Sequence, residues 1–272
     1  MTILCRFGEL TLKGNNRSVF ERQLIQNIKR ACKRYAFSIK KVQARLFIEA
    51  DRKTEEMMIP LLQRIFGLMS VSLAISVPDE AGLHPAIDAA LLGKDFATFR
   101  ITVQRLNKIG KTSEELERSL GEYVQDKYVK KVRLKQYDLE ISVEVIDRFY
   151  IFTDRLSCVG GLPLGIEGTV LAVIRDASDV YAAWLMMKRG CIVVPVALLP
   201  EHPDVSLLSN YHNPIPLQRI SDIKEVALIA QKYSALAVVQ GLKELNLPDM
   251  VTFRPLAAMG YDEVERNVDA LS

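Results

Sequence analysis

The chain has 272 residues, of which 49% are hydrophobic and 25% charged, and this composition excludes wholesale disorder and leaves room for two or three domains. No apolar run is long enough to cross a bilayer and the start lacks the pattern of a secretion signal, so we expect a cytoplasmic protein without a membrane partner. The net charge of +3 is unevenly distributed, because residues 161–272 carry 9 Lys/Arg and 13 Asp/Glu. The remaining 27 Lys/Arg and 20 Asp/Glu give residues 1–160 a net charge of +7, which favours a polyanionic partner.

The first 77 residues follow the order strand, helix, strand, strand, helix, strand, which is that of a ferredoxin-like unit. Ser18 and Glu21 have the spacing of a capping box at the start of the first helix. Pro60 lies inside the second helical pattern and must kink or begin that helix. The expected strands are 2–7, 38–42, 45–50 and 68–77, and the expected helices are 18–35 and 54–66.

Residues 78–160 form a second small α+β unit in this interpretation. A Pro- and Gly-containing linker at 78–82 separates it from the first. Alternating apolar residues predict a hairpin of strands 139–145 and 149–153. The other expected elements are helices 86–92 and 113–126 and a strand at 99–103, followed by a polar loop at 105–111.

Residues 161–272 show a different pattern, which begins at the glycine-rich breaker 160–165. Continuous apolar strands alternate with helices, as in a parallel, doubly wound sheet. We therefore expect an α+β N-terminal half followed by an α/β domain. The predicted strands are 170–174, 192–199 and 235–239, and the predicted helices are 180–189, 222–233 and 261–271.

The cysteines and histidines indicate no metal or catalytic site. The cysteines are far apart and lack zinc-ligand spacing, so we interpret them as small buried hydrophobes, with a redox or sulfur-carrying role kept open for Cys158 and Cys191. The histidines are interpreted as surface-loop residues, because no acid–base group accompanies them in sequence. These residues are Cys5, Cys32, Cys158, Cys191, His84, His202 and His212.

Four segments carry a resemblance to a known family. They are RFGELTLKGNNR at 6–17, GGLPLGIEG at 160–168, AAWLMMKRG at 182–190 and RPLAAM at 254–259. In this order they resemble segments of the tRNA 4-thiouridine synthetases, also called thiamine-biosynthesis sulfurtransferases. Several matches in order across nearly the whole chain are much more specific than any one of them.

The resemblance implies three domains and a set of partners. The domains are a ferredoxin-like domain at 1–77, a THUMP domain at 78–160 that binds the acceptor end of tRNA, and a PP-loop ATP-pyrophosphatase-like domain at 161–272. The implied partners are tRNA, ATP as a cofactor, a second copy of the chain in a homodimer, and a sulfur donor or an active paralogue. The implied chemistry is thiolation of tRNA to 4-thiouridine, with a link to thiamine biosynthesis.

The chain departs from the family at the ATP loop. There the family has S-G-G-x-D-S before its helix, and its glycines let backbone N–H groups approach the pyrophosphate. Both glycines are replaced here, and two carboxylates would repel a triphosphate. Asp179 would make a sound helix N-cap instead, and Arg175 would still suit a phosphate. The aligned positions of this degenerate nucleotide-binding loop are Ile174, Arg175, Asp176, Ala177, Ser178 and Asp179.

The family's catalytic cysteine lies downstream of the loop, and no cysteine follows Cys191 here. We also expect no rhodanese domain. We therefore expect a tRNA binder that cannot adenylate by itself, and we assign no catalytic residue. Two alternatives stay open: an active ATP-dependent sulfurtransferase with an atypical loop or a partner-supplied site, and a non-catalytic dimerisation scaffold whose helix 180–189 contributes to the interface.

Three basic groups are candidates for RNA contact. In the first, a turn before a helix suits a phosphate contact, although Arg6 would equally pair with Glu9. The second group lies in a strand and the following loop, and the alternative to RNA contact is a solvated loop. The third lies among Tyr123, Tyr128 and Tyr137, and its alternative is a solvated loop with tyrosines in the core. The predicted RNA-binding residues are Arg6, Lys13, Arg17, Arg100, Arg105, Lys108, Lys111, Lys130, Lys131 and Arg133.

Overall fold

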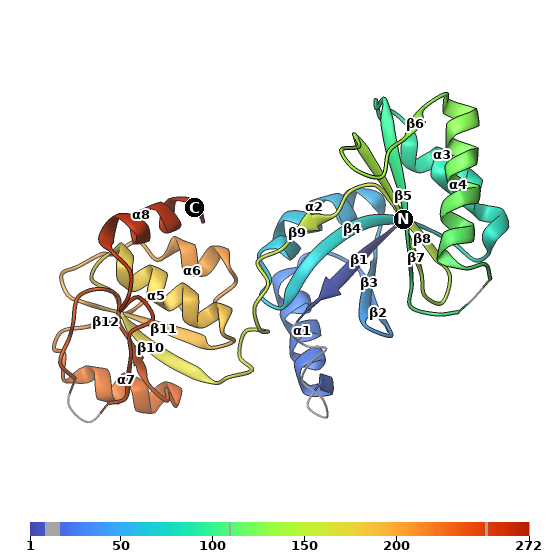
Figure 1. Cartoon of the computed structure of the whole chain (residues 1–272). Helices are drawn as coiled ribbons and strands as arrows, with labels where there is room; N and C mark the ends of the chain where they lie inside the picture. Colours follow the sequence, from blue (N-terminus) through green and yellow to red (C-terminus); the bar gives the residue numbers. More distant parts are fainter. Residues whose placement is uncertain (9–16, 109, 248–249, 272) are drawn as a thin grey trace. The chain divides into compact units, whose positions relative to one another are not determined.

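The computed structural model describes residues 1–8, 17–108, 110–247 and 250–271 (Figure 1). The chain divides into two compact units whose segments alternate along the sequence. The first unit contains Met1–Phe7, Arg34–Gln63 and Ser70–Ser157, and the second contains Gly8–Lys33, Arg64–Met69 and Cys158–Ser272. The domain boundaries expected at residues 77 and 160 stay a prediction.

A nine-stranded sheet runs through the first unit in the order β2-β3-β1-β4-β8-β7-β5-β6, with β9 paired to β4. β5 is parallel to β6 and β7, whereas the hairpins β2–β3 and β7–β8 are antiparallel. The strands are β1 (Thr2–Phe7), β2 (Ser38–Val42), β3 (Arg45–Glu49), β4 (Leu68–Val77), β5 (Thr98–Arg105), β6 (Lys131–Val132), β7 (Leu139–Val145), β8 (Phe149–Phe152) and β9 (Leu156–Ser157).

Helices cover one face of the β5–β7–β8 part of this sheet. Alternate residues of β5, namely Phe99, Ile101 and Val103, are buried in one cluster with residues of α3 and α4. Thr102 and Gln104 point to the other face of the strand and keep solvent contact. Thr112 and Glu115 form a reciprocal capping box that fixes the start of α4. The helices of the first unit are α2 (Arg52–Gln63), the 3-10 helix η3 (Glu80–Gly82), α3 (Leu83–Leu91) and α4 (Ser113–Tyr128).

A five-stranded parallel sheet forms the centre of the second unit, in the order β12-β11-β10-β13-β14. Val170 and Ala172 of β10 pack among α5, α6 and α8, whereas Leu171 and Val173 pack with α7. Both faces of the sheet are therefore buried, which confirms the expected α/β architecture beside an α+β half. The strands are β10 (Thr169–Val173), β11 (Ile192–Leu198), β12 (Gln218–Ile220), β13 (Val238–Val239) and β14 (Thr252–Phe253); the helices are α1 (Arg17–Ala31), α5 (Ala177–Lys188), α6 (Ser206–Asn210), α7 (Glu225–Tyr233) and α8 (Tyr261–Asp269).

The helix α1 belongs to the second unit through specific hydrogen bonds. Gln23 Nε2 and Asn27 Nδ2 both donate to the carbonyl oxygen of Leu164, at 2.9 and 3.0 Å. The expected capping box is wrong in one respect, because Ser18 lies inside α1 rather than at its N-cap. The side chain of Glu21 accepts instead from Arg17 Nε at 2.8 Å.

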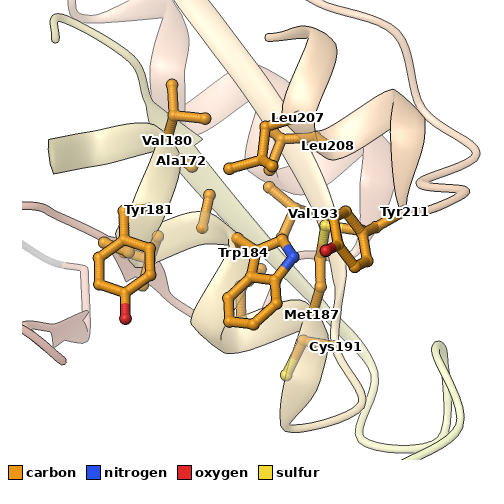
Figure 2. Packing of buried hydrophobic residues seen from close by; sticks show 14 of the residues in the cluster. Ala172, Val180, Tyr181, Trp184, Met187, Cys191, Val193, Leu207, Leu208 and Tyr211 are labelled. Carbon is orange, nitrogen blue, oxygen red and sulfur yellow. The ribbon is translucent and has the colours of Figure 1, made fainter. Parts of the chain in front are cut away.

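An aromatic cluster around Trp184 anchors α5 to the core of the second unit (Figure 2). The indole lies edge-on to Phe66 and Tyr211, with ring centroids 5.7 and 5.4 Å away. Cys191 is buried in the same cluster, and burial, assisted by Glu167, raises the pKa of its thiol. A raised pKa disfavours the thiolate, so this cysteine packs as a small hydrophobe.

Candidate functional site

The turn from β10 into α5 binds its own backbone donors. Asp176 is the N-cap of α5, and its Oδ1 accepts from the backbone N–H groups of Ser178 and Asp179 at 3.0 and 3.4 Å. The hydroxyl of Ser178 donates to the same carboxylate oxygen at 2.6 Å. The expectation that Asp179 caps the helix is wrong, because Asp176 comes first at the extended position from which a side chain reaches these amides.

Asp179 is completely buried and forms an ion pair with Arg175. Its two carboxylate oxygens accept from Arg175 Nη2 and Nε at 2.8 and 3.0 Å, and Oδ2 also accepts from the backbone N–H of Arg175. A fourth donor, the backbone N–H of Gly241, lies 2.8 Å from Oδ1. The charge is thus satisfied by hydrogen bonds, as a buried carboxylate requires.

Residues 241–244 close over this turn. The guanidinium of Arg175 donates to the carbonyl oxygens of Lys243 and Glu244, at 2.7 and 3.4 Å. Lys243 Nζ pairs with Asp176 at 3.0 Å. Although burial opposes the shift, hydrogen bonds from Ser178 and Lys243 lower the pKa of the Asp176 carboxyl. The amides and the cation that a phosphate would use here are therefore already bound within the chain.

The first basic group is divided between a buried and a half-exposed position. Arg6 is buried in the first unit, where its Nε lies 2.6 Å from Glu144 and its Nη1 donates to Ser72 Oγ at 3.0 Å. Arg17 is half-exposed at the start of α1. Lys13, together with Glu9 as the other partner considered for Arg6, lies outside the described residues. Of the two described members of this group, Arg17 is the one whose side chain reaches solvent.

The second basic group runs along β5 and past its end. Arg100 is half-exposed and its Nη1 donates to the carbonyl of Leu134 at 3.4 Å, whereas Arg105 is half-buried at the other end of the strand. Lys108 is exposed, and the exposed Lys111 pairs with Glu80 at 3.3 Å. Arg100 and Arg105 are thus about 16 Å apart along the strand, at about 3.3 Å per residue, and Lys108 and Lys111 follow after the strand ends.

The third basic group meets the second at the sheet edge. β6 pairs with β5 so that Lys131 lies opposite Thr98, and the backbone N–H of Arg133 donates to Phe99 O at 2.8 Å. Lys131 and Arg133 are exposed, and the Nζ of Lys130 lies 5.3 Å from the ring of Phe96. Three cations of this edge, Arg100, Lys131 and Arg133, thus come from two segments 30 residues apart.

The tyrosines between these cations bind a carboxylate. The hydroxyls of Tyr123 and Tyr128 donate to Asp88 of α3 at 2.8 and 2.7 Å, and Lys127 pairs with Asp88 at 2.6 Å. The ring of Tyr123 stacks on His84, with centroids 3.8 Å apart. Burial, followed by the hydrogen bond to Asp88, raises the pKa of Tyr128 to about 12. This part of the predicted stacking surface is therefore tied to α3.

Sequence reasoning did not find the charged network around Glu144. This carboxylate is only 1% exposed and is surrounded by the guanidinium groups of Arg6, Arg45 and Arg155. The sequence signal is a second glutamate, after Glu140, inside the apolar strand 139–145. Its partners are up to 138 residues away in sequence, so no local pattern could have identified them.

The described part of the chain has no group of three or more His, Cys, Asp or Glu side chains suited to a metal ion. Among the helices described, none has the length and apolar character required to span a membrane. His202 lies 3.3 Å from Arg219 through its Nδ1 and a guanidinium nitrogen, which places it outside any cluster of acidic ligands.

Comparison with known families matches two domains of the chain. The ThiI ferredoxin-like domain matches residues 2–72, and the THUMP domain matches residues 85–154. A probable tRNA sulfurtransferase of Thermococcus kodakarensis is 34% identical over 210 residues, which cover 71% of this chain and 54% of that protein. One of Methanocaldococcus jannaschii is 28% identical over 259 residues, covering 87% and 68%. The chain spans about half the length of the first of these relatives.

Two solved structures share the fold. The protein PH1313 from Pyrococcus horikoshii superimposes with a TM-score of 0.84 at 24% identity, covering 99% of both chains. A 4-thiouridine synthetase in complex with RNA and ATP gives a TM-score of 0.81 at 21% identity, covering all of this chain and 84% of the other. At these identities the likeness establishes the fold alone.

Proposed function

Because the chain belongs to the ThiI family of tRNA sulfurtransferases, through its ferredoxin-like and THUMP domains, we propose that it binds tRNA with these domains and does not adenylate it at the β10–α5 turn. The net charge of +7 on residues 1–160 supports a polyanionic partner. The observation that carries the proposal is the exposed cationic edge of β5 and β6 within the segment matched by the THUMP domain.

The cationic edge is suited to backbone contacts. Lys131 of β6 and Arg133, two residues further along the chain, are both exposed, and Arg100 lies on the neighbouring strand β5. Contacts of this kind position an RNA without reading its sequence, so shape and unpaired ends would determine which RNA is bound. A solved relative of the same fold is described as a 4-thiouridine synthetase–RNA complex, which agrees with this use of the fold.

Filter binding of tRNA at several salt concentrations tests the RNA half of the proposal. Neutralising phosphates with lysine and arginine releases counterions, so the logarithm of affinity falls linearly with the logarithm of salt concentration. We expect such a fall for the full chain. A tRNA affinity that stays constant as salt rises would remove the proposal.

The closed β10–α5 turn supports the second half. A phosphate at a helix N-terminus needs free amide donors, and Asp176 occupies those of Ser178 and Asp179. Asp179 adds a buried negative charge, and its ion pair with Arg175 holds that cation inside the turn. We expect no heat on titration with ATP and Mg²⁺, with or without tRNA.

Two alternatives are separated by the same measurements. An active sulfurtransferase with an atypical or partner-supplied site predicts ATP binding in the presence of tRNA or of the partner. A dimerisation scaffold predicts a dimer mass in light scattering. A groove of about 550 Å³ favours the scaffold, since Leu185 and Met186 of α5 line it with Pro255 and Met259. The rest of the apolar side of α5 is buried in its own core.

A further inference from the structure

A cavity of about 390 Å³ lies on the face of the β5–β7–β8 sheet that α3 and α4 do not cover. Thr102 and Ser142 lie on neighbouring strands and point to this face. The residues on either side of each along its strand are buried with the helices, and side chains alternate between the two faces of a sheet. The volume is within the range of pockets that hold small organic ligands. The lining residues that bear on a ligand are Thr102, Glu140, Ser142, Glu144 and Arg155.

Three arginines surround Glu144 at one end of the cavity, and of these Arg155 lines the cavity itself. Glu144 is surrounded by three guanidiniums: Arg6 Nε at 2.6 Å, Arg45 Nε at 2.9 Å and Arg155 Nη2 at 3.5 Å. One carboxylate cannot neutralise three cations, and Arg6 is itself buried. The Nη2 of Arg6 is buried without a hydrogen-bond partner among the described residues. Buried uncompensated charge is costly, so an anion here would be stabilised.

Arg155 is the member of this network that can move toward a ligand. Its side chain is 52% exposed, and its distance of 3.5 Å to Glu144 is longer than that of either other arginine. A guanidinium has five N–H donors, and its planar fork matches a phosphate. Arg155 can therefore donate to an anion in the cavity while the buried pair Arg6–Glu144 stays in place.

The opposite end of the cavity accepts hydrogen bonds. Glu140 lies four residues before Glu144 on β7, about 13 Å away at about 3.3 Å per residue. Its carboxylate accepts from Thr102 Oγ1 at 2.5 Å and from the hydroxyl of Tyr137 at 3.4 Å. Hydroxyl groups of Thr102 and Ser142 line the floor between the two ends. A complementary ligand has an anionic group at one end and hydroxyl or amino donors at the other.

We propose that this cavity binds one nucleotide, with the phosphate at Arg155 and a ribose hydroxyl or base amino group donating to Glu140. A phosphate with a sugar and a base has the required chemistry in one molecule. The nucleotide is either free or an unpaired nucleotide of a bound RNA strand. In the second case the inference rests on the tRNA-binding proposal and gives it a defined site.

The test uses the full chain, with adenosine monophosphate and inorganic phosphate as separate titrants in calorimetry. Arg155→Gln removes the phosphate donor, and Glu140→Gln removes the acceptor charge. Arg148→Gln is the matched control, because Arg148 is an exposed arginine of the same unit that does not line the cavity. Thermal melts by circular dichroism verify that each variant is folded.

We expect Arg155→Gln to weaken the binding of adenosine monophosphate by about tenfold or more, as for loss of a hydrogen bond to a charged group. Glu140→Gln should weaken the binding of adenosine monophosphate and leave the affinity for inorganic phosphate unchanged. Arg148→Gln should change neither affinity. A labelled single-stranded RNA distinguishes the two sources. If Arg155→Gln weakens the binding of RNA alone, the cavity holds a nucleotide of the strand. If it weakens the binding of the mononucleotide, the cavity holds a free ligand.

Equal binding of adenosine monophosphate and of labelled RNA by wild type and a folded Arg155→Gln variant would overturn the inference, as would the absence of binding of both ligands by wild type. This failure is distinct from failure of the tRNA proposal. If Arg155→Gln binds tRNA as tightly as wild type does, the tRNA-binding proposal stands without this cavity. The mononucleotide titration tests the cavity without any tRNA.

Discussion

Asp179 Oδ1 lies 2.8 Å from Arg175 Nη2, and this ion pair occupies the β10–α5 turn, which we expect from the sequence resemblance to correspond to the family's phosphate-binding loop. The carboxylate is completely buried and also accepts the amide of Gly241. The turn therefore satisfies within one chain the charges that an ATP-binding turn would direct at its ligand.

Replacing Asp179 with Asn should destabilise the second unit strongly. The change leaves Arg175 without its counter-charge in a partly buried site, which costs about 3–5 kcal/mol in comparable buried pairs. Urea unfolding measures the loss. Asp262→Asn, at an exposed position of α8, is the control and should stay within about 0.5 kcal/mol. A loss below that of the control would show that the pair contributes nothing to stability.

The N-cap at Asp176 should make stability depend on pH. Its pKa is lowered in the folded chain, so its contribution is fully present above the unfolded value of about 3.9 and is lost as pH falls through the folded pKa. Asp176→Ala should cost about 1 kcal/mol near neutral pH, and less and less below about pH 4. Unfolding at pH 2–7 measures the difference, and one that does not change with pH would contradict this assignment.

Gly241 should not tolerate a side chain. A Cβ at this position would collide with the Ser178 hydroxyl and the Asp179 backbone nitrogen, both fixed by the N-cap. Gly241→Ala should cost about 1–3 kcal/mol, as overpacking does elsewhere. Gly121→Ala, inside α4, is the control, since nothing lies within 4 Å of its Cβ position and alanine favours a helix interior. Thermal melting of both variants provides the comparison, and equal melting temperatures would refute the close approach.

The double variant Lys131→Gln/Arg133→Gln should weaken tRNA binding for all tRNAs alike. If both side chains contact phosphates, the slope of log affinity against log salt should fall by about 2. The control is Arg52→Gln/Lys53→Gln, two exposed cations at the start of α2. An unchanged slope in the β6 variant, or an equal change in the control, would place the RNA elsewhere on the chain.

Periodicity predicted the longer elements because their patterns are local. The alternation of β5 and the apolar run of β10 each follow from which faces are buried, and both strands lie where expected. Two-residue strands such as β9 and β14 were not predicted, since two residues carry no period. Their pairing is determined by neighbouring strands that lie far away in sequence.

The site was harder to predict than the fold because its contacts are distant in sequence. Asp176 and Asp179 are equally good N-cap residues by type, and Asp179 turns inward to accept from Arg175 and from the amide of Gly241, which is 62 residues away. Likewise, Arg6 was divided between RNA and Glu9, whereas its buried partner is Glu144. Charged partners leave no periodic trace, so sequence patterns cannot assign them.

The hydrogen bonds from Gln23 and Asn27 to the Leu164 carbonyl affect the order in which the protein can fold during synthesis. Gln23 is made 141 residues before Leu164, so at about 5–20 residues per second its partner follows roughly 7–28 s later. During that interval α1 is a nascent amphipathic helix with an uncovered side. Fragments that end before residue 164 would carry the same uncovered side permanently, and would be prone to associate through it.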